Sequence, residues 1–178
     1  NPYVNMAKVL THILVEGGME YCLGSFDGKR IDYDFSKVLT YLNAKGKSLF
    51  GESFQVRKED KDTFLKLCSY MVKDSENCRK MEVDINKGIL LTGPVGCGKT
   101  SMMRLIRHIV PHQRTYDIIP ARNITFAFNH IGFKILTHIT TNLNAEELEK
   151  RYGKRVRSRM RQMFNLISFD NNTKDKRI

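Results

Sequence analysis

The stretch Gly93-Pro94-Val95-Gly96-Cys97-Gly98-Lys99-Thr100 decides the fold, because it matches the pattern G-x-x-x-x-G-K-[ST] at every fixed position. A short apolar run over residues 87–92 precedes it, which is typical of a buried parallel strand. Residues 101–110 follow with apolar side chains at helical spacing, up to Pro111. A strand, a glycine-rich turn and a helix in this order predict a loop that binds the phosphates of a nucleotide.

Each residue type in this loop has a chemical role. Glycines permit the tight turn that aims successive backbone N–H groups at a phosphate. Lys99 would bring an ammonium group to the β- and γ-phosphates, and Thr100 would offer its hydroxyl to Mg²⁺. We therefore expect ATP and Mg²⁺ as cofactors, with Lys99 catalytic and Thr100 the metal ligand. The expected nucleotide-binding residues are Gly93, Pro94, Val95, Gly96, Cys97, Gly98, Lys99, Thr100 and Ser101.

Runs with strand character alternate with runs with helix character on both sides of the loop. The pattern predicts strands over residues 87–92, 116–119, 135–141 and 166–169, and helices over 64–72, 101–110, 124–133, 145–152 and 156–163. This alternation predicts an α/β fold with an open, mostly parallel sheet, as in the three-layer sandwich of P-loop NTPases. We expect residues 51–178 to form this core. Residues 1–50 would be a small, helical accessory region, with helices over 4–15 and 33–42.

The composition fits a globular protein with a polyanionic partner. The 178 residues include 30 Lys and Arg against 19 Asp and Glu, a net charge of +11, which suggests nucleic acid. The apolar runs are far shorter than the roughly 18 residues of a membrane span. The four cysteines have neither C-x-x-C nor zinc-site spacing, so we expect them reduced in a cytoplasmic protein. Because the sequence opens with Asn1-Pro2, we expect a longer natural chain.

Two polar clusters follow the loop along the chain. Asn142 comes directly after the expected third strand, where it would orient a water near a γ-phosphate or serve only as a turn residue. Six Arg and Lys residues fall within residues 151–161. Arg155 and Arg159 are spaced i, i+4 and share one helix face. That face is either a solvated basic surface or an arginine finger that stabilises transition-state charge on a neighbouring subunit.

Three motifs in this order resemble the DnaC/IstB branch of the AAA+ ATPases, which are bacterial helicase loaders and transposition helpers. They are the loop at residues 93–100, Ile139-Thr140-Thr141-Asn142-Leu143, and Arg-Tyr-Gly-x-Arg-x-x-Ser-Arg over residues 151–159. The resemblance covers about residues 87–170. It implies that Asn142 is the sensor-1 residue, and that Arg159, with Arg155, contacts the nucleotide of a neighbouring subunit. It also implies an ATPase that is active as a homo-oligomer, with DNA, preferably single-stranded, and a replicative helicase or transposase as partners.

The sequence departs from that family in one respect. Hydrolysing P-loop ATPases need a strand that ends in an acid, yet Asp117 is the single acidic residue between Ser101 and Asn142. Either the protein binds nucleotide without hydrolysing it, or a segment of the natural chain is missing from this sequence near residues 132–136, which is our hypothesis. Asp170 also ends an apolar run, which would suit a kinase-like transferase. An ATPase, a nucleotide-gated binding module and a P-loop kinase therefore stay open as functions.

Overall fold

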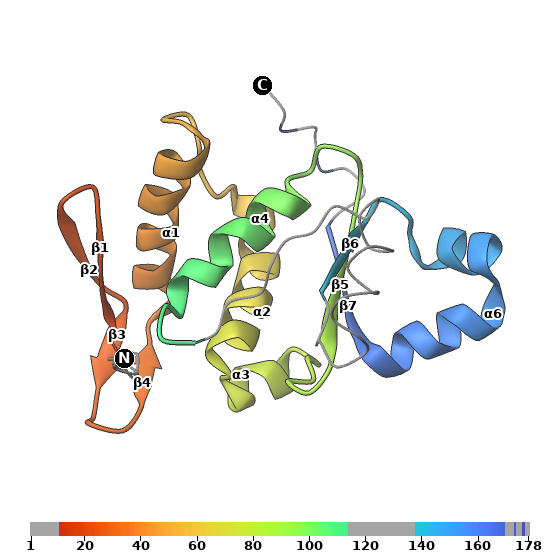
Figure 1. Ribbon diagram of the computed structural model, residues 1–178, viewed down its shortest axis with the longest axis horizontal. Helices are drawn as coiled ribbons and strands as arrows, with labels where there is room; N and C mark the ends of the chain where they lie inside the picture. The colour runs from red at the N-terminus through yellow and green to blue at the C-terminus, as the bar shows by residue number, and fades with distance from the viewer. Residues whose placement is uncertain (1–10, 114–137, 170–172, 174–175, 177–178) are drawn as a thin grey trace, which may run out of the picture.

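The computed structural model describes residues 11–113, 138–169, 173 and 176 (Figure 1). These residues combine helices with strands, and the largest sheet has three parallel strands. Three expectations lie outside the described residues: the strand at 116–119, the helix at 124–133 and the missing segment near 132–136. The three-layer sandwich, which includes them, stays a prediction. Across the described ranges, no helix combines the length and the apolar character that a membrane crossing requires.

The strand that leads into the glycine-rich loop lies at the centre of the parallel sheet. This strand, β5 (Gly88–Thr92), pairs with β6 (Ile139–Thr141) on one side and with β7 (Phe164–Ser168) on the other. All five residues of β5 are buried, which explains its uninterrupted apolar run. Thr92 lies opposite Thr141 and Ser168, so all three strands end at the same edge of the sheet. The structure confirms the strands expected at 87–92 and 166–169. It also confirms the strand expected at 135–141 over the part that is described.

Four helices follow from local signals in the sequence. They are α2 (Lys61–Val72), α3 (Ser75–Lys80), α4 (Lys99–Ile106) and α6 (Ala145–Met163), with 3₁₀ turns η1 (Lys58–Asp60) and η2 (Arg107–Ile109) beside α2 and α4. Asn144 caps the start of α6: its side-chain oxygen accepts hydrogen bonds from the backbone N–H groups of Glu146 and Glu147, and the carboxylate of Glu147 accepts from the backbone N–H of Asn144, which completes a capping box. The two helices expected at 145–152 and 156–163 are joined across a bend at Gly153.

The first fifty residues differ from the expected helical region. Residues 13–33 form two antiparallel hairpins, β1 (Ile13–Glu16) with β2 (Met19–Cys22) and β3 (Gly24–Phe26) with β4 (Ile31–Tyr33). The helix expected over residues 4–15 is therefore wrong at its described end, because Gly17 and Gly18 turn the chain after four residues. The second helix is confirmed as α1 (Phe35–Phe50), which continues past Gly46. Phe54 packs where a Cβ at that glycine would stand, so glycine fits this position in the helix.

One hydrophobic core joins the two parts of the chain. Its buried residues include Leu14, Val38 and Leu42 from the first fifty positions together with Leu67 and Leu91 from α2 and β5. Figure 1 shows α1, α2 and α4 on one side of the sheet, whereas α6 extends from the other side. This packing fixes β5 firmly and leaves the loop that follows it at the sheet edge.

Candidate nucleotide-binding site

The glycine-rich loop has a backbone that depends on its glycines. Gly93, Gly96 and Gly98 have φ angles of 154°, 79° and 94°, a region that residues with side chains rarely adopt. A Cβ on Gly93 would also lie 2.7 Å from Cβ of Phe169 and 3.2 Å from Sγ of Cys97. Glycine is therefore required at residue 93 both for its backbone angle and for its close neighbours.

Lys99 directs its ammonium group into the loop. The side chain is almost fully buried, with 8% of the residue exposed. Its Nζ donates to the carbonyl oxygens of Gly93 at 2.8 Å and Pro94 at 2.7 Å. Lys99 is also the first residue of α4, whose amino end accepts no side-chain cap from the described residues. A positive charge and the backbone N–H groups of a helix amino end thus meet in one place, and both favour an anion there.

The remaining loop residues divide into accessible and buried ones. Thr100 is exposed at the second position of α4, where a cation bound to a nucleotide could reach its hydroxyl. Val95 is exposed at the loop tip. Cys97 is fully buried, and its Sγ lies 3.6 Å from Nζ of Lys99, so its thiol fills space under the loop.

Asn142 lies at the same sheet edge as the loop. It directly follows β6, and the residue before it, Thr141, pairs in register with Thr92 at the end of β5. The hydroxyl of Thr92 donates to the carbonyl of Leu143 at 2.7 Å, which ties the two strand ends together. Asn142 is exposed. The structure therefore brings Asn142 and the loop together at one edge, as the sequence predicted.

Arg155 and Arg159 lie on the half of α6 that ends at the opposite edge of the sheet from the loop. Both are exposed on the second half of α6, which reaches the sheet at its opposite edge (Figure 1). The carbonyl oxygen of Arg161 accepts a hydrogen bond of 3.3 Å from Nζ of Lys87, the residue directly before β5. The five residues of β5 span roughly 16 Å between that point and the loop. The carboxyl end of α6 and the nucleotide loop therefore lie at opposite ends of β5.

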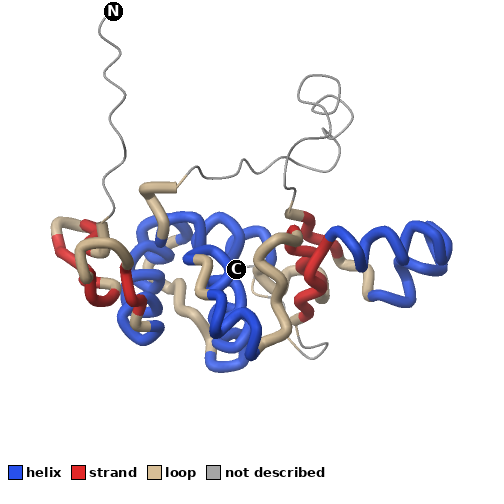
Figure 2. Tube along the Cα trace, turned by 90° about the horizontal axis from the view of Figure 1, so that it is seen from below, coloured by secondary structure: helices blue, strands red, loops and turns tan. Residues whose placement is uncertain are grey.

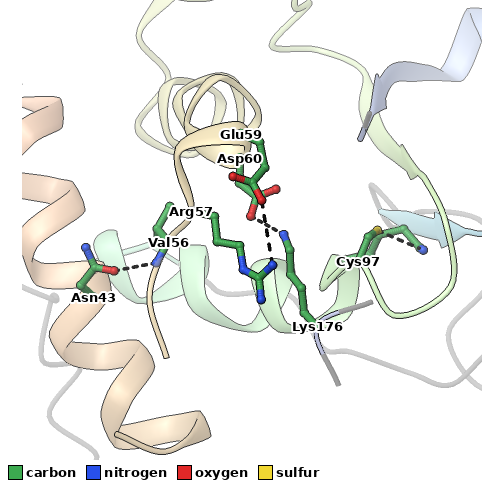
Figure 3. Close-up of polar contacts among 8 residues, drawn as sticks. Asn43, Val56, Arg57, Glu59, Asp60, Cys97 and Lys176 are labelled. Atoms are coloured by element: carbon green, nitrogen blue, oxygen red, sulfur yellow. Dashed lines mark hydrogen bonds and ion pairs between the residues drawn. The ribbon is translucent and has the colours of Figure 1, made fainter. Parts of the chain in front are cut away.

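Asp60 and Lys176 complete the surroundings of the loop, and the sequence did not indicate either of them. The backbone N–H of Lys176 donates to the carbonyl of Gly96 at 2.9 Å, and its ammonium pairs with the carboxylate of Asp60 (Figure 3). The same ammonium lies 5.3 Å from the ring centre of Phe169. Asp60 is only 4% exposed, and its Oδ1 has no hydrogen-bond partner in the described part of the chain. No sequence signal links residues 60 and 176, since 116 positions separate them.

The acidic residues considered for Mg²⁺ fall elsewhere. Asp117 and Asp170 lie outside the described residues. The described strands β5 and β6 are followed by Gly93 and Asn142, and neither provides a carboxylate. Of the residues considered as Mg²⁺ ligands, Thr100 is therefore the one that is described beside the loop.

Comparisons of the chain with protein-family models, with curated proteins and with solved structures gave no match. The loop, the strand order around it and the chemistry of the surrounding side chains are therefore the features that bear on function.

Proposed function

We propose that the protein is an AAA+-type P-loop ATPase that binds ATP with Mg²⁺ at residues 93–101 and acts on DNA or on a DNA-bound partner. The roles implied are those of a helicase loader or a transposition helper. One observation carries the proposal: a glycine-dependent loop joins a buried central parallel strand to a helix, with the ammonium of Lys99 inside the loop. This combination of positive charge and free N–H groups suits a triphosphate.

The described residues suggest how such a site would work. On binding, Lys99 exchanges the carbonyls of Gly93 and Pro94 for phosphate oxygens, because an ionised acceptor forms the stronger hydrogen bond. Thr100 would hold Mg²⁺, and the ion would supply positive charge to the β- and γ-phosphates. Asn142, at the neighbouring strand end, orients the attacking water. Arg159 of an adjacent subunit stabilises the charge that develops on the γ-phosphate.

A nucleotide-gated binding module with little turnover is the second candidate. It is favoured by the absence of a carboxylate directly after β5 or β6 in the described part of the chain. Such a protein would use ATP to change its affinity for a partner, without needing a group that activates water.

Radiolabelled ATP separates these functions in one experiment. Release of inorganic phosphate, increased by single-stranded DNA and dependent on Lys99, supports the ATPase. Tight ATP binding without phosphate release supports the binding module. Transfer of phosphate to a small acceptor would contradict both and support a kinase. Absence of ATP binding would refute the proposal altogether.

A further inference from the structure

A buried ion pair joins Lys176 to the start of α2. It consists of the carboxylate of Asp60 and the ammonium of Lys176, and both side chains are mostly buried (Figure 3). We call these two residues the latch. Asp60 directly precedes α2, yet its side chain forms no cap hydrogen bond with that helix. The carboxylate is instead directed to a partner 116 positions away, although an aspartate at a helix start usually binds the backbone N–H groups of its own helix.

Charge balance explains why the latch should hold. An ionised carboxylate that is almost fully buried is costly unless a cation lies next to it. Among the described residues, Lys176 is the cation that pairs with Asp60, and the second oxygen of that carboxylate has no hydrogen-bond partner there. Loss of the ammonium would therefore leave a buried negative charge without compensation.

Lys176 also contacts the glycine-rich loop from outside. Its backbone N–H donates to the carbonyl of Gly96 at 2.9 Å. Its Cδ lies 3.6 Å from the position that a Cβ on Gly98 would occupy. Through Asp60, the same residue is tied to α2, which belongs to the layer of helices that Figures 1 and 2 show on one side of the sheet. Lys176 thus connects the loop to this layer.

The hydrogen bond to Gly96 determines which way one peptide group of the loop faces. The carbonyl of Gly96 and the N–H of Cys97 belong to the same planar trans peptide, so they point in opposite directions. That N–H donates to the carbonyl of Pro94 at 3.4 Å, and the same carbonyl accepts from Nζ of Lys99 at 2.7 Å. Lys176 therefore holds the peptide with its carbonyl outward and its N–H toward the ammonium of Lys99.

A phosphate oxygen would compete well for the N–H of Cys97. Its hydrogen bond of 3.4 Å to the carbonyl of Pro94 is long for an N–H donor and an oxygen acceptor. An ionised oxygen is the stronger acceptor. A peptide that already faces the phosphate need not turn on binding, so less affinity is lost to ordering of the loop.

We infer that Lys176 is a positioning residue of the nucleotide loop: its backbone orients the peptide between Gly96 and Cys97 for a phosphate, and its ion pair with Asp60 fixes that backbone in place. The inference rests on the proposed function for the identity of the ligand. The effect of the latch on the loop itself does not depend on nucleotide. Because the donor to Gly96 is a backbone group, side-chain substitutions act on the anchor and not on the donor.

Substitutions of the latch test the inference. Lys176→Met keeps an unbranched side chain without its charge, and Asp60→Leu replaces the carboxylate by an apolar group of similar size. We expect each to weaken the binding of ATP with Mg²⁺ roughly 3- to 30-fold in isothermal titration calorimetry, within the usual range for coupled groups. Lys176→Arg keeps the cation and should bind ATP like the wild type. The double variant of Leu at 60 and Met at 176 contains no unpaired buried charge, so it should fold and bind ATP no more weakly than either single variant.

Lys45→Met is the matched control. It breaks the pair of Lys45 with Glu16, which is also mostly buried but joins α1 to the end of β1. The control should lower the melting temperature and leave the affinity for ATP unchanged. Native-state hydrogen exchange without nucleotide reports the loop directly, because the amide of Cys97 should exchange faster in the latch variants than in Lys45→Met.

The outcomes separate the positioning role from the proposed function. A wild-type chain that binds no ATP contradicts the proposed function, whereas faster exchange at Cys97 in the latch variants still supports the positioning of the loop. Folded latch variants that bind ATP as tightly as the wild type, or more tightly, would overturn the positioning role. Unchanged exchange at Cys97, an equal loss of affinity in Lys45→Met, or weak binding by Lys176→Arg would also overturn it, because the latch would then be only a structural ion pair.

Discussion

At the scale of single residues, the hydrogen bonds of Lys99 determine what its loss should do. Replacing Lys99 with Ala removes the ammonium from the loop and leaves the carbonyls of Gly93 and Pro94 without this donor. A hydrogen bond between ionised groups contributes about 1.5–3 kcal/mol, so we expect ATP affinity to fall by one to two orders of magnitude. Isothermal titration calorimetry measures this change. Lys80→Ala, at an exposed position of α3, is the control and should bind ATP normally.

Gly93 allows backbone strain and steric contact to be separated. We expect Gly93→Ala to reduce the free energy of unfolding by about 2–4 kcal/mol, because the new Cβ meets Phe169 and the backbone angle is unfavourable. Gly28→Ala is the matched control, since Gly28 also has a positive φ but no atom within 4 Å of its missing Cβ. It should cost only about 1 kcal/mol. Equal losses for the two variants in urea unfolding would show that Phe169 does not constrain the loop.

At the scale of secondary-structure elements, His138 links β6 to β5 in a way that depends on pH. Its Nδ1 accepts from the backbone N–H of Ile89 at 3.1 Å, and its ring packs edge-on against Tyr70. Burial lowers the pKa of His138 below its ordinary value of 6.5, so the folded state favours the neutral ring. The unfolded chain binds this proton more readily, so the stabilisation is complete above about pH 6.5 and is lost as the pH falls below that value.

We therefore expect the free energy of unfolding to decrease between pH 7 and pH 5, and His138→Asn to reduce that decrease. Asn provides an oxygen that can accept from Ile89 but does not titrate. Burial, followed by the charges of Lys45 and Arg107, also lowers the pKa of His108, so part of the dependence should remain in the variant. Urea unfolding at a series of pH values tests this expectation. An unchanged pH dependence in His138→Asn would exclude His138 as the titrating group.

The sequence predicted those elements whose signals are local. The apolar run of β5 and the helical spacing of α4 depend on neighbouring residues, and the structure confirms both elements. The hairpins were missed because their strands have only three or four residues, too few to reveal alternation. The pair of Asp60 and Lys176 was missed because tertiary folding alone brings these residues together.

At the scale of the whole molecule, the sheet separates the two halves of the proposed catalytic machinery. The loop and Asn142 lie at the carboxyl edge of β5 and β6, whereas Arg155 and Arg159 lie on the second half of α6, which joins the sheet at its other edge. Under the proposed mechanism, each chain would bind a nucleotide and receive its arginine from a neighbouring chain. It follows that hydrolysis per chain should rise with protein concentration, as assembly increases.

The same separation predicts that two inactive variants will complement each other. Arg159→Ala should bind ATP normally but lose about 10³–10⁵-fold in hydrolysis, the usual effect of removing an arginine finger. Lys99→Ala should bind ATP one to two orders of magnitude more weakly but keep a normal Arg159. In a mixed assembly, a Lys99→Ala chain can donate Arg159 to the loaded loop of an Arg159→Ala neighbour, so phosphate release should reappear on mixing. Steady-state release measured across mixing ratios, with each variant alone as control, tests this expectation. Mixtures as inactive as their components, although ultracentrifugation detects joint assembly, would place the action of Arg159 outside the neighbouring site.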